Sequence, residues 1–536
     1  MNPENVENRP RQPCPPSRQA ARGARGTTQT GPAPDSADRR DWGLLALGAL
    51  LPLLATALLY ALDIPLGKPR QFAYPYSPIC LRRLAAVPSV IALAGVLAAA
   101  TSLFFSPRRP VRALGGLVAV LAACGAGVWV YVAPPQFRSQ HTFNMLSPSH
   151  DGAFLTEGRY LLRTGVREYL RHFPQRAQSP PQAMRGTRVI SNPPGTTLLA
   201  AGTLRLLALS PGLACWIAGW GLEPDVPAEG RQVIIDSLAF SVALWLLWVL
   251  AGPLLYLANR QLLAPAAAAV VALLCWLSPA TMLLTPGKDT AQLLTTALPL
   301  CLWLLAARRG RAGAAFLAGA AFVLACLLSL VHIWIAAIVL CATTIAAGPE
   351  GRRRLAVRCV IPAAGGAAVA TAALYALLDA NLPAIAWSAA RAQAEVTRGA
   401  GAMPLAWQAL GIPLFLLFAG PALWCCGLWL ARGRLRDADA RCGAGLVLGS
   451  LLVMVATVGF TNVETPRLWI PFTPLLLAGL ALQLPLFRSP GRKAATLLTM
   501  LVFVQLGAAA VQWSLMDMRE AETRLLERAG GARLFH

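Results

Sequence analysis

Long apolar runs dominate the pattern of this chain. Runs of about 18 or more mostly apolar residues recur between short polar connectors, and each is long enough to cross a membrane as a helix. The runs are continuous and do not alternate with polar positions, which argues against a transmembrane β-barrel. We therefore predict an all-α, polytopic membrane protein with about 13 transmembrane helices. The predicted spans are 42–62, 84–105, 112–133, 232–258, 265–285, 290–307, 312–329, 330–347, 356–378, 406–431, 442–460, 467–486 and 494–513.

Positive charge in the connectors predicts which side of the membrane each connector occupies, because Arg and Lys gather in cytoplasmic loops. All the Arg-rich connectors fall on the cytoplasmic side only if the apolar stretch 195–220 does not cross the bilayer. Arg205 in its middle and an interruption at 210–212 also favour an interfacial helix. The N-terminus is then cytoplasmic and the C-terminus external, in a multi-pass protein of the cell (inner) membrane. The connectors are 106–112, Arg260, 308–311, 351–358, 432–441 and 488–493.

The first long external loop, 134–231, carries a charged amphipathic segment at 147–173. Its apolar residues recur at helical spacing, and an arginine stands at every fourth position. Such a helix lies in the membrane surface, so the loop is predicted to contain two interfacial helices. Like charges four residues apart repel, so anions should lie nearby, either lipid headgroups or the phosphate of a lipid-linked substrate. This Arg row consists of Arg159, Arg163, Arg167 and Arg171.

Composition and charge fit the same class of protein. The chain is 56% hydrophobic and 13% charged, with a formal net charge of +23. The Arg clusters fall mostly in short connectors between the apolar runs, which argues against a nucleic-acid partner. The 12 cysteines show no metal-ligand spacing and are interpreted as small buried hydrophobes. Residues 1–41, rich in Pro, Arg, Gly and Ser, are predicted to form a disordered basic cytoplasmic tail.

Two aspartates begin helices on the predicted external face. Asp151 stands just before the amphipathic helix, where it would cap that helix; a carboxylate there also suits general-base work on a hydroxyl. Lys288 and Asp289 stand at the start of a span. For Asp289, a role as N-cap and a role as a second site carboxylate both remain open. The surrounding glycine spacing does not fit a P-loop.

Further polar residues fall on the same face. Glu464 and Arg467 lie close together at the mouth of a span, where Arg467 either pairs with Glu464 or clamps a phosphate. His332 lies near the external end of a short helix, in a structural or a site role. Polar residues from four distant segments are thus all predicted to lie on one face of the membrane. We therefore predict a functional site on that face. A transporter would instead carry ionisable residues near the bilayer midplane, and Asp236, the only acid well inside a span, is near its end.

These segments, in this order, resemble the GT-C superfamily of integral-membrane glycosyltransferases. The most similar branch is that of the polyprenyl- or dolichyl-phosphate-sugar-dependent mannosyl- and aminoarabinosyltransferase-like proteins. The family's first external loop opens with an Asp, usually Asp-Glu, before an interfacial helix ending in Gly, as residues 151–165 do except for Gly152. A Pro-Pro motif, here Pro193-Pro194, then opens a second interfacial helix. The family carries an acid at the external end of a later span, which Asp289 resembles. It also carries a late Glu or Arg motif before a Pro-containing span, which residues 464–471 resemble.

The resemblance implies transfer of a sugar from a polyprenyl-phosphate donor to an acceptor hydroxyl of a glycan, lipid or protein on the external (periplasmic) face. Some branches of the family use a divalent cation, and the number of carboxylates here does not decide whether this chain does. A transporter or flippase of a lipid-linked substrate and a non-catalytic scaffold are the alternative functions. The implied catalytic residues are Asp151, as general base, and Asp289, and the implied substrate contacts are Arg159, Arg163, Lys288, His332, Glu464 and Arg467.

The same reasoning divides the chain into four parts. Residues 1–41 form the tail and 42–111 two extra N-terminal transmembrane helices. Residues 112–486 form the GT-C-like catalytic core, and 487–536 the last transmembrane helix with a short external tail.

Overall fold

The computed structural model describes residues 39–64, 66–68, 72–74, 87–132, 151–180, 189–221, 228–399, 405–458, 465–488 and 490–515. The predicted N-terminal tail lies almost wholly outside these residues, and Glu464 lies outside them too.

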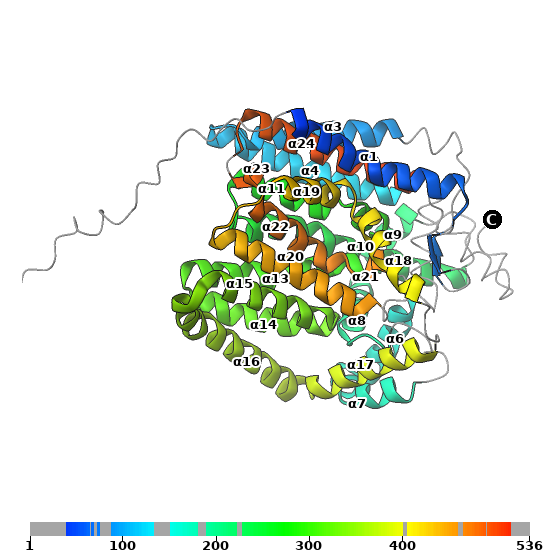
Figure 1. Cartoon of the computed structure of the whole chain (residues 1–536). Coiled ribbons are helices and arrows are strands. Elements are labelled where there is room, and N and C mark those ends of the chain that lie inside the picture. The colour runs from blue at the N-terminus through cyan, green and yellow to red at the C-terminus, as the bar shows by residue number, and fades with distance from the viewer. Residues whose placement is uncertain are drawn as a thin grey trace, which may run out of the picture.

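Nearly all regular structure in the described residues is helical (Figure 1). One antiparallel pair of three-residue strands, β1 (Leu66–Lys68) and β2 (Phe72–Tyr74), is the exception. The helices are α1 (Arg39–Ala61), α3 (Val87–Phe104), α4 (Arg109–Val132), α6 (Gly152–Thr164), α7 (Val166–Gln178), α8 (Gly195–Leu209), α9 (Pro211–Gly221), α10 (Ala228–Asn259), α11 (Pro265–Trp276), α12 (Pro279–Leu283), α13 (Lys288–Arg309), α14 (Ala312–Leu328), α15 (Val331–Leu355), η2 (Ala356–Val360), α16 (Ile361–Leu378), α17 (Leu382–Gly399), α18 (Leu405–Ala419), α19 (Pro421–Arg432), α20 (Ala438–Thr457), α21 (Thr465–Leu468), η4 (Ile470–Phe472), α22 (Thr473–Gln483), α23 (Pro485–Arg488) and α24 (Arg492–Leu515).

The predicted fold class, an all-α protein of the polytopic membrane kind, is confirmed, but the predicted count of 13 transmembrane helices is wrong. The described residues contain 7 helices long and apolar enough to cross a membrane, or up to 9 if each sharply bent pair counts as one span. Several apolar runs break where the sequence places Pro. The run 265–285 divides into α11 and α12 before Pro279, and the run 406–431 bends by 103° before Pro421.

Two of the predicted spans are short helices in the protein core. Helix α11 has 12 residues, about 18 Å at the rise of an α-helix, which is less than the hydrocarbon core of a bilayer. Every residue of the 11-residue α22 is buried. In contrast, α1 and α16 expose large apolar side chains, such as Leu54 at 61% and Leu377 at 73%. Hydropathy alone does not separate a helix that faces lipid from one that other helices surround.

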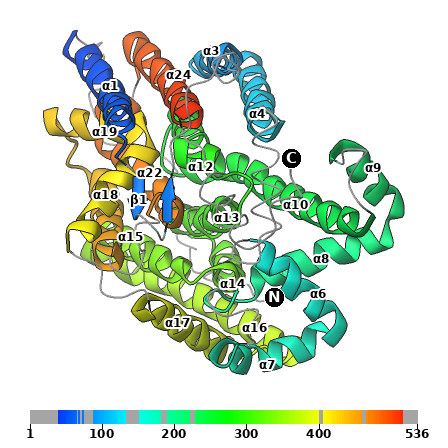
Figure 2. The ribbon, with the colours of Figure 1, turned by 90° about the vertical axis from the view of Figure 1, so that its right-hand side faces the viewer.

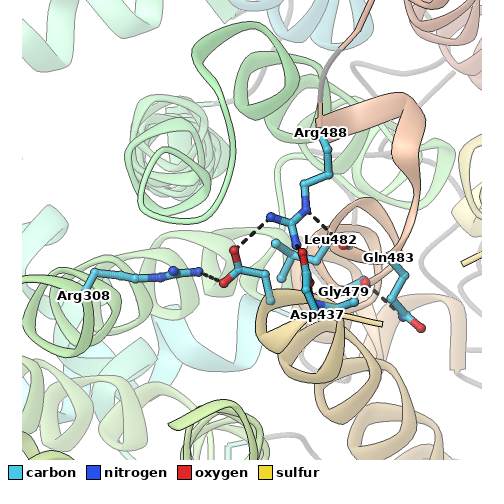
Figure 3. A network of polar contacts seen from close by, with 8 residues as sticks. Arg308, Asp437, Gly479, Leu482, Gln483 and Arg488 are labelled. Carbon is cyan, nitrogen blue, oxygen red and sulfur yellow. Dashed lines mark hydrogen bonds and ion pairs between the residues drawn. The ribbon is translucent and has the colours of Figure 1, made fainter. Parts of the chain in front are cut away.

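Helix α13 lies near the centre of the bundle and defines its two ends (Figure 2). It has 22 residues and is about 33 Å long, close to the hydrocarbon thickness of a membrane. At its C-terminal end, Arg308 and Arg488 converge on a network that includes Asp437 and Asp439 (Figure 3). The Arg-rich connectors 308–311, 432–441 and 488–493 therefore meet at this end.

The opposite end carries the helices of the predicted external loop, α6, α7, α8 and α9, together with α17 (Figure 1). Helices α8 and α9 meet at an angle of 101° at Ser210-Pro211. With 15 residues, α8 is about 22 Å long and too short to cross a bilayer alone. This elbow is compatible with an interfacial element, and the prediction that 195–220 does not cross the membrane stays a prediction.

Helices α14 and α16 cross in close contact through two glycines. A Cβ atom on Gly319 would lie 1.8 Å from the carbonyl oxygen of Ala363, and one on Gly366 would lie 1.9 Å from that of Phe316. Small residues allow such close approach between apolar helices, and in a membrane the resulting van der Waals packing drives helix association.

Candidate functional site

Five polar side chains from distant parts of the chain meet at the end of the bundle that carries α6 and α8. They are Asp151, Asn192, Lys288, Asp289 and Arg467, called here the polar cluster. The backbone N–H of Lys288 donates to Asp151 Oδ2 at 3.2 Å, and Lys288 Nζ lies 2.8 Å from Asn192 Oδ1 and 3.1 Å from Asp289 Oδ1. Arg467 Nε lies 2.9 Å from Asp289 Oδ2. Four of the residues chosen from the sequence are thus in mutual contact.

Asp151 precedes α6 but does not cap it, so the N-cap interpretation was wrong for that helix. Its backbone is already helical, with φ −69° and ψ −18°, and its side chain makes no cap hydrogen bond to α6. The carboxylate instead accepts the N–H of Lys288, the first residue of α13. That N–H has no acceptor within its own helix, and the helix dipole favours a negative charge there. Asp151 therefore joins the start of α6 to the start of α13.

Asp289 is the second residue of α13, whose N-cap position is occupied by Gly287, so the N-cap role for Asp289 is wrong as well. Its carboxylate accepts a hydrogen bond from Gln292 Nε2 at 2.9 Å and forms ion pairs with Lys288 and Arg467. Asp289 thereby holds two cations at one point, one from its own helix and one from α21.

Lys288, which the sequence places on the external face, is buried, with only 4% of its surface exposed. A buried ammonium group needs partners, and it finds them in Asp289 and Asn192. Asn192 is a residue that the sequence reasoning did not select. It stands directly before Pro193-Pro194, and α8 starts immediately after this turn. The sequence signal that could have indicated Asn192 is its polar amide, which stands directly before the Pro-Pro turn of a segment already predicted to belong to the site.

The formal charges of the polar cluster cancel. It holds two carboxylates and two cations, and the exposed fractions are 6% for Asp151, 4% for Lys288, 4% for Asp289 and 8% for Arg467. Buried charges of opposite sign compensate one another when they are close, and here the ion pairs of Asp289 with Lys288 and Arg467 measure 3.1 Å and 2.9 Å. An anionic ligand at this point would share Lys288 and Arg467 with Asp289 rather than meet unpaired cations.

His332 lies beside α13, about two turns below Asp289. Its Nδ1 is 2.8 Å from the carbonyl oxygen of Ser329, which can only accept, so Nδ1 carries the proton. Nε2 then accepts from the hydroxyl of Thr295 at 3.0 Å, with Thr296 at 3.4 Å. These contacts explain the position of His332 and leave its predicted role in substrate binding as a prediction.

An apolar cavity of about 260 Å³ begins at His332 and Thr296 and extends between α13, α14, α15 and α16 as far as Trp303. Most of its lining is aliphatic or aromatic. Ala364 of α16, which lines the cavity, is itself exposed on the outer surface of the bundle. The cavity therefore lies below the polar cluster, among the apolar helices, and reaches the outer surface of the bundle.

Protein carboxylates neutralise most of the Arg row. Arg159 pairs with Asp236 at 2.6 Å, and Arg167 and Arg171 each pair with Asp379 at 2.6 Å. Hydrogen bonds from Arg167 and Arg171 lower the pKa of the Asp379 carboxyl to about 2. The anions expected beside the row are thus side chains that attach α6 to α10 and α7 to α16. Asp236 and Asp379 are distant in sequence, so no local pattern indicated these pairs.

Arg163 differs from the rest of the Arg row. It is exposed and forms no ion pair with any residue in the described part of the chain. Glu157, on the same helix, is buried and forms two hydrogen bonds of 3.0 Å with Arg176, whose guanidinium stacks 3.8 Å from the Tyr160 ring. Burial raises the pKa of the Glu157 carboxyl, and Arg176 acts against that shift. Glu157 therefore holds α6 to α7, and Arg163 is the one member of the Arg row that pairs with no carboxylate among the described residues.

The donor set at the polar cluster does not fit a divalent cation. Within the described residues, no group of three or more His, Cys, Asp or Glu side chains is placed to hold a metal ion. Both oxygens of Asp289 are already occupied, by Lys288 and the Gln292 amide on one side and by Arg467 on the other. The two cations would repel a metal ion, and the amide would have to be displaced before the metal could bind. Glu464, a possible further carboxylate in the sequence motif, lies outside the described residues.

In comparisons with known proteins, no family model matches this chain, and no curated protein matches it either. The fold and the site together define a multi-pass α-helical membrane protein with a buried, charge-balanced polar cluster at one end of its bundle and an apolar cavity beneath it.

Proposed function

We propose that this protein is a membrane glycosyltransferase of the GT-C kind, which transfers a sugar from a polyprenyl-phosphate donor to an acceptor hydroxyl on the external face of the cell membrane. The observation that carries the proposal is the polar cluster, in which two carboxylates and two cations from separate segments lie at one helix end. Its position fits a reaction at the membrane surface better than transport, for which charges near the midplane would be expected.

The chemistry assigned to the cluster follows from its groups. Asp151 takes the proton of the acceptor hydroxyl, and the hydroxyl oxygen bonds to the anomeric carbon of the sugar. The bond between that carbon and the phosphate oxygen breaks, and the polyprenyl phosphate leaves with the bonding electrons. Lys288 and Arg467 stabilise the charge that develops on the phosphate, while Asp289 holds both cations in place.

The apolar cavity supports a lipid-linked donor. A prenyl chain is purely apolar, and the cavity begins about two helical turns, or about 10 Å, below Asp289. One polyprenyl-phosphate donor could therefore place its phosphate at the polar cluster and the first part of its prenyl chain in the cavity. We place the polar cluster on the external face because the Arg-rich connectors, which favour the cytoplasmic side, meet at the opposite end of the bundle.

The function is tested with the full chain reconstituted into liposomes that contain radiolabelled polyprenyl-phosphate sugars and membrane extract as the source of acceptor. We expect label to move from the donor to an acceptor, with release of polyprenyl phosphate. Flipping of intact donor without cleavage would instead identify a flippase, and no change in the donor at all would support a scaffold.

A second prediction concerns the apolar cavity. Replacing Ala364, which lines it, with Phe should raise the KM for a long-chain donor about tenfold or more, because the ring occupies space that the prenyl chain needs. The steady-state rate with donors of increasing chain length measures this effect, and the loss should grow with chain length.

The matched control is Ala368→Phe. Ala368 lies one turn further along α16, is equally exposed, and does not line the cavity. If both Phe variants changed the KM to the same extent, the cavity would have no role in donor binding.

A third prediction concerns Arg467. Its guanidinium offers a planar fork to phosphate oxygens, whereas the Lys ammonium is a point charge. Replacing Arg467 with Lys should therefore weaken donor binding about tenfold while the protein remains folded. Equilibrium binding of a labelled polyprenyl phosphate to wild-type and variant protein measures the change.

Arg434→Lys serves as the control, because Arg434 is exposed in the connector at the opposite end of the bundle. Unchanged donor binding in the Arg467 variant would assign Arg467 to structure alone, as the partner of Asp289.

A further inference from the structure

A second cavity, of about 370 Å³, lies between α4, α10 and α11. Its wall is formed mainly by Ala, Gly, Leu, Phe and Trp side chains, and Arg112 and Tyr256 are the polar side chains that line it. Its shape follows from the packing of the N-terminal helices. Helix α3 packs along α24, and α4 follows α3 and contacts α10 (Figure 2). The cavity lies between α4 and the helices α10 and α11.

This cavity lies at the end of the bundle opposite to the polar cluster. Asp236, near the start of α10, pairs with Arg159 at the site end. Tyr256 is 20 residues further along the same helix, about 30 Å away at the α-helical rise. Arg112, in the first turn of α4, and Pro265, the first residue of α11, line the same cavity. The mouth of the cavity is therefore at the level of the Arg-rich connectors.

The charge at this mouth has no counterion within the described residues. Arg108, Arg109 and Arg112 lie within one helical turn, and Arg112 Nη1 donates to the carbonyl oxygen of Ser106 at 3.3 Å. None of the three arginines forms an ion pair in the described part of the chain. At the same end, Arg308 and Arg488 are by contrast neutralised by aspartates, Arg488 by Asp437 at 2.9 Å. The mouth thus combines unneutralised positive charge with an apolar interior.

The interior is kept open by small residues on its walls. Trp276 lies 2.5 Å from the position that a Cβ atom of Gly252 would occupy, so the indole packs directly on the backbone of α10. On the opposite wall, a Cβ atom on Gly116 would meet only the Phe104 ring, at 3.7 Å, which is an ordinary van der Waals contact. A side chain at Gly116 therefore has room, and it would occupy the cavity rather than displace a helix.

We propose that this cavity binds one anionic phospholipid of the leaflet at the Arg-rich end, with an acyl chain between α4, α10 and α11 and the phosphate at Arg112. Basic pockets between transmembrane helices bind anionic headgroups, because their positive charge attracts the phosphate at the membrane surface. The apolar interior beside Arg112 suits an acyl chain, which is itself apolar. No carboxylate among the described residues pairs with these arginines, so they are available to a phosphate, and the apolar interior excludes a simple inorganic anion as the whole ligand. This site is independent of sugar transfer.

Native mass spectrometry of the full chain tests the proposal. Protein purified in mild detergent is titrated with dioleoyl phosphatidylglycerol or with dioleoyl phosphatidylcholine. We expect one phosphatidylglycerol to bind about tenfold more tightly than phosphatidylcholine. Arg112→Gln should remove this preference, and Gly116→Leu should weaken binding of the anionic lipid by filling the cavity. Thermal unfolding midpoints show that each variant is folded.

Arg434→Gln is the matched control, since it removes an exposed arginine at the same end that does not line the cavity. It should bind phosphatidylglycerol as the wild type does. Equal affinity for the two lipids would overturn the proposal, and so would a folded Arg112→Gln variant with wild-type lipid preference. If Gly116→Leu bound the anionic lipid as tightly as wild type, the acyl chain would not occupy this cavity.

Discussion

Replacing Asp151 with Asn should lower the rate of sugar transfer about 10²- to 10⁴-fold, because Asn cannot accept a proton from the acceptor hydroxyl. Asn keeps an oxygen that can accept the backbone N–H of Lys288, so the link between α6 and α13 is retained. The lost negative charge at the start of α13 costs about 2 kcal/mol of helix-dipole stabilisation, since Asp151 is buried. The variant should therefore be folded and bind donor while transfer is lost. Transfer of label in membranes that carry either protein measures the effect.

Asp437→Asn provides the matched control for this experiment. Asp437 also accepts a backbone N–H at a helix start, that of Ala440 at 2.7 Å, but at the opposite end of the bundle. Since Asn and Asp cap helices about equally well, the rate of transfer should stay within about threefold of wild type. If the Asp151 variant also kept a rate in that range, Asp151 would be a structural link between two helices and not the base.

The second large effect is expected on stability, at the crossing of α14 and α16. Gly366→Ala places a Cβ atom where the carbonyl oxygen of Phe316 lies 1.9 Å away, so the helices must separate. Forcing extra volume into a packed contact costs about 1–3 kcal/mol, and the effect should be at the upper end because the obstacle is backbone. The thermal unfolding midpoint of the purified protein should fall, and the cavity between α13 and α16 should lose its shape.

The neighbouring residue supplies the control for this substitution. A Cβ atom on Gly365 would meet nothing within 4 Å. Gly365→Ala should leave stability unchanged or raise it by up to about 1 kcal/mol, since Ala favours the helix over Gly. If the two variants had the same unfolding midpoint, the close approach of α14 and α16 would not contribute to the stability of the bundle.

The helices of this protein could be predicted from local pattern, whereas the number of membrane crossings could not. Apolar runs of about 18 or more residues predict helices wherever they occur, and most predicted spans overlap an observed helix. The interruptions before Pro279 and Pro421 were visible in the sequence, but their consequence depends on the neighbours. A break in an apolar helix leaves backbone N–H and C=O groups without partners, and it is tolerated when other helices shield these groups from lipid, as they do for α11. Packing between distant segments decides whether such helices are present.

The candidate site shows the same division. The sequence by itself determined that Lys288, Asp289 and Arg467 stand at the ends of apolar runs, because charged groups are costly inside a bilayer and cheap at its surface. It also determined that Asp151 stands at the start of an amphipathic helix. Only the tertiary structure decided their partners. Asp151 accepts from α13 rather than from its own helix, Asp289 joins Lys288 to Arg467, and Asn192 completes the cluster. Ion pairs and hydrogen bonds depend on separations of about 3 Å, and residues far apart in the sequence reach such separations only through the packing of whole helices.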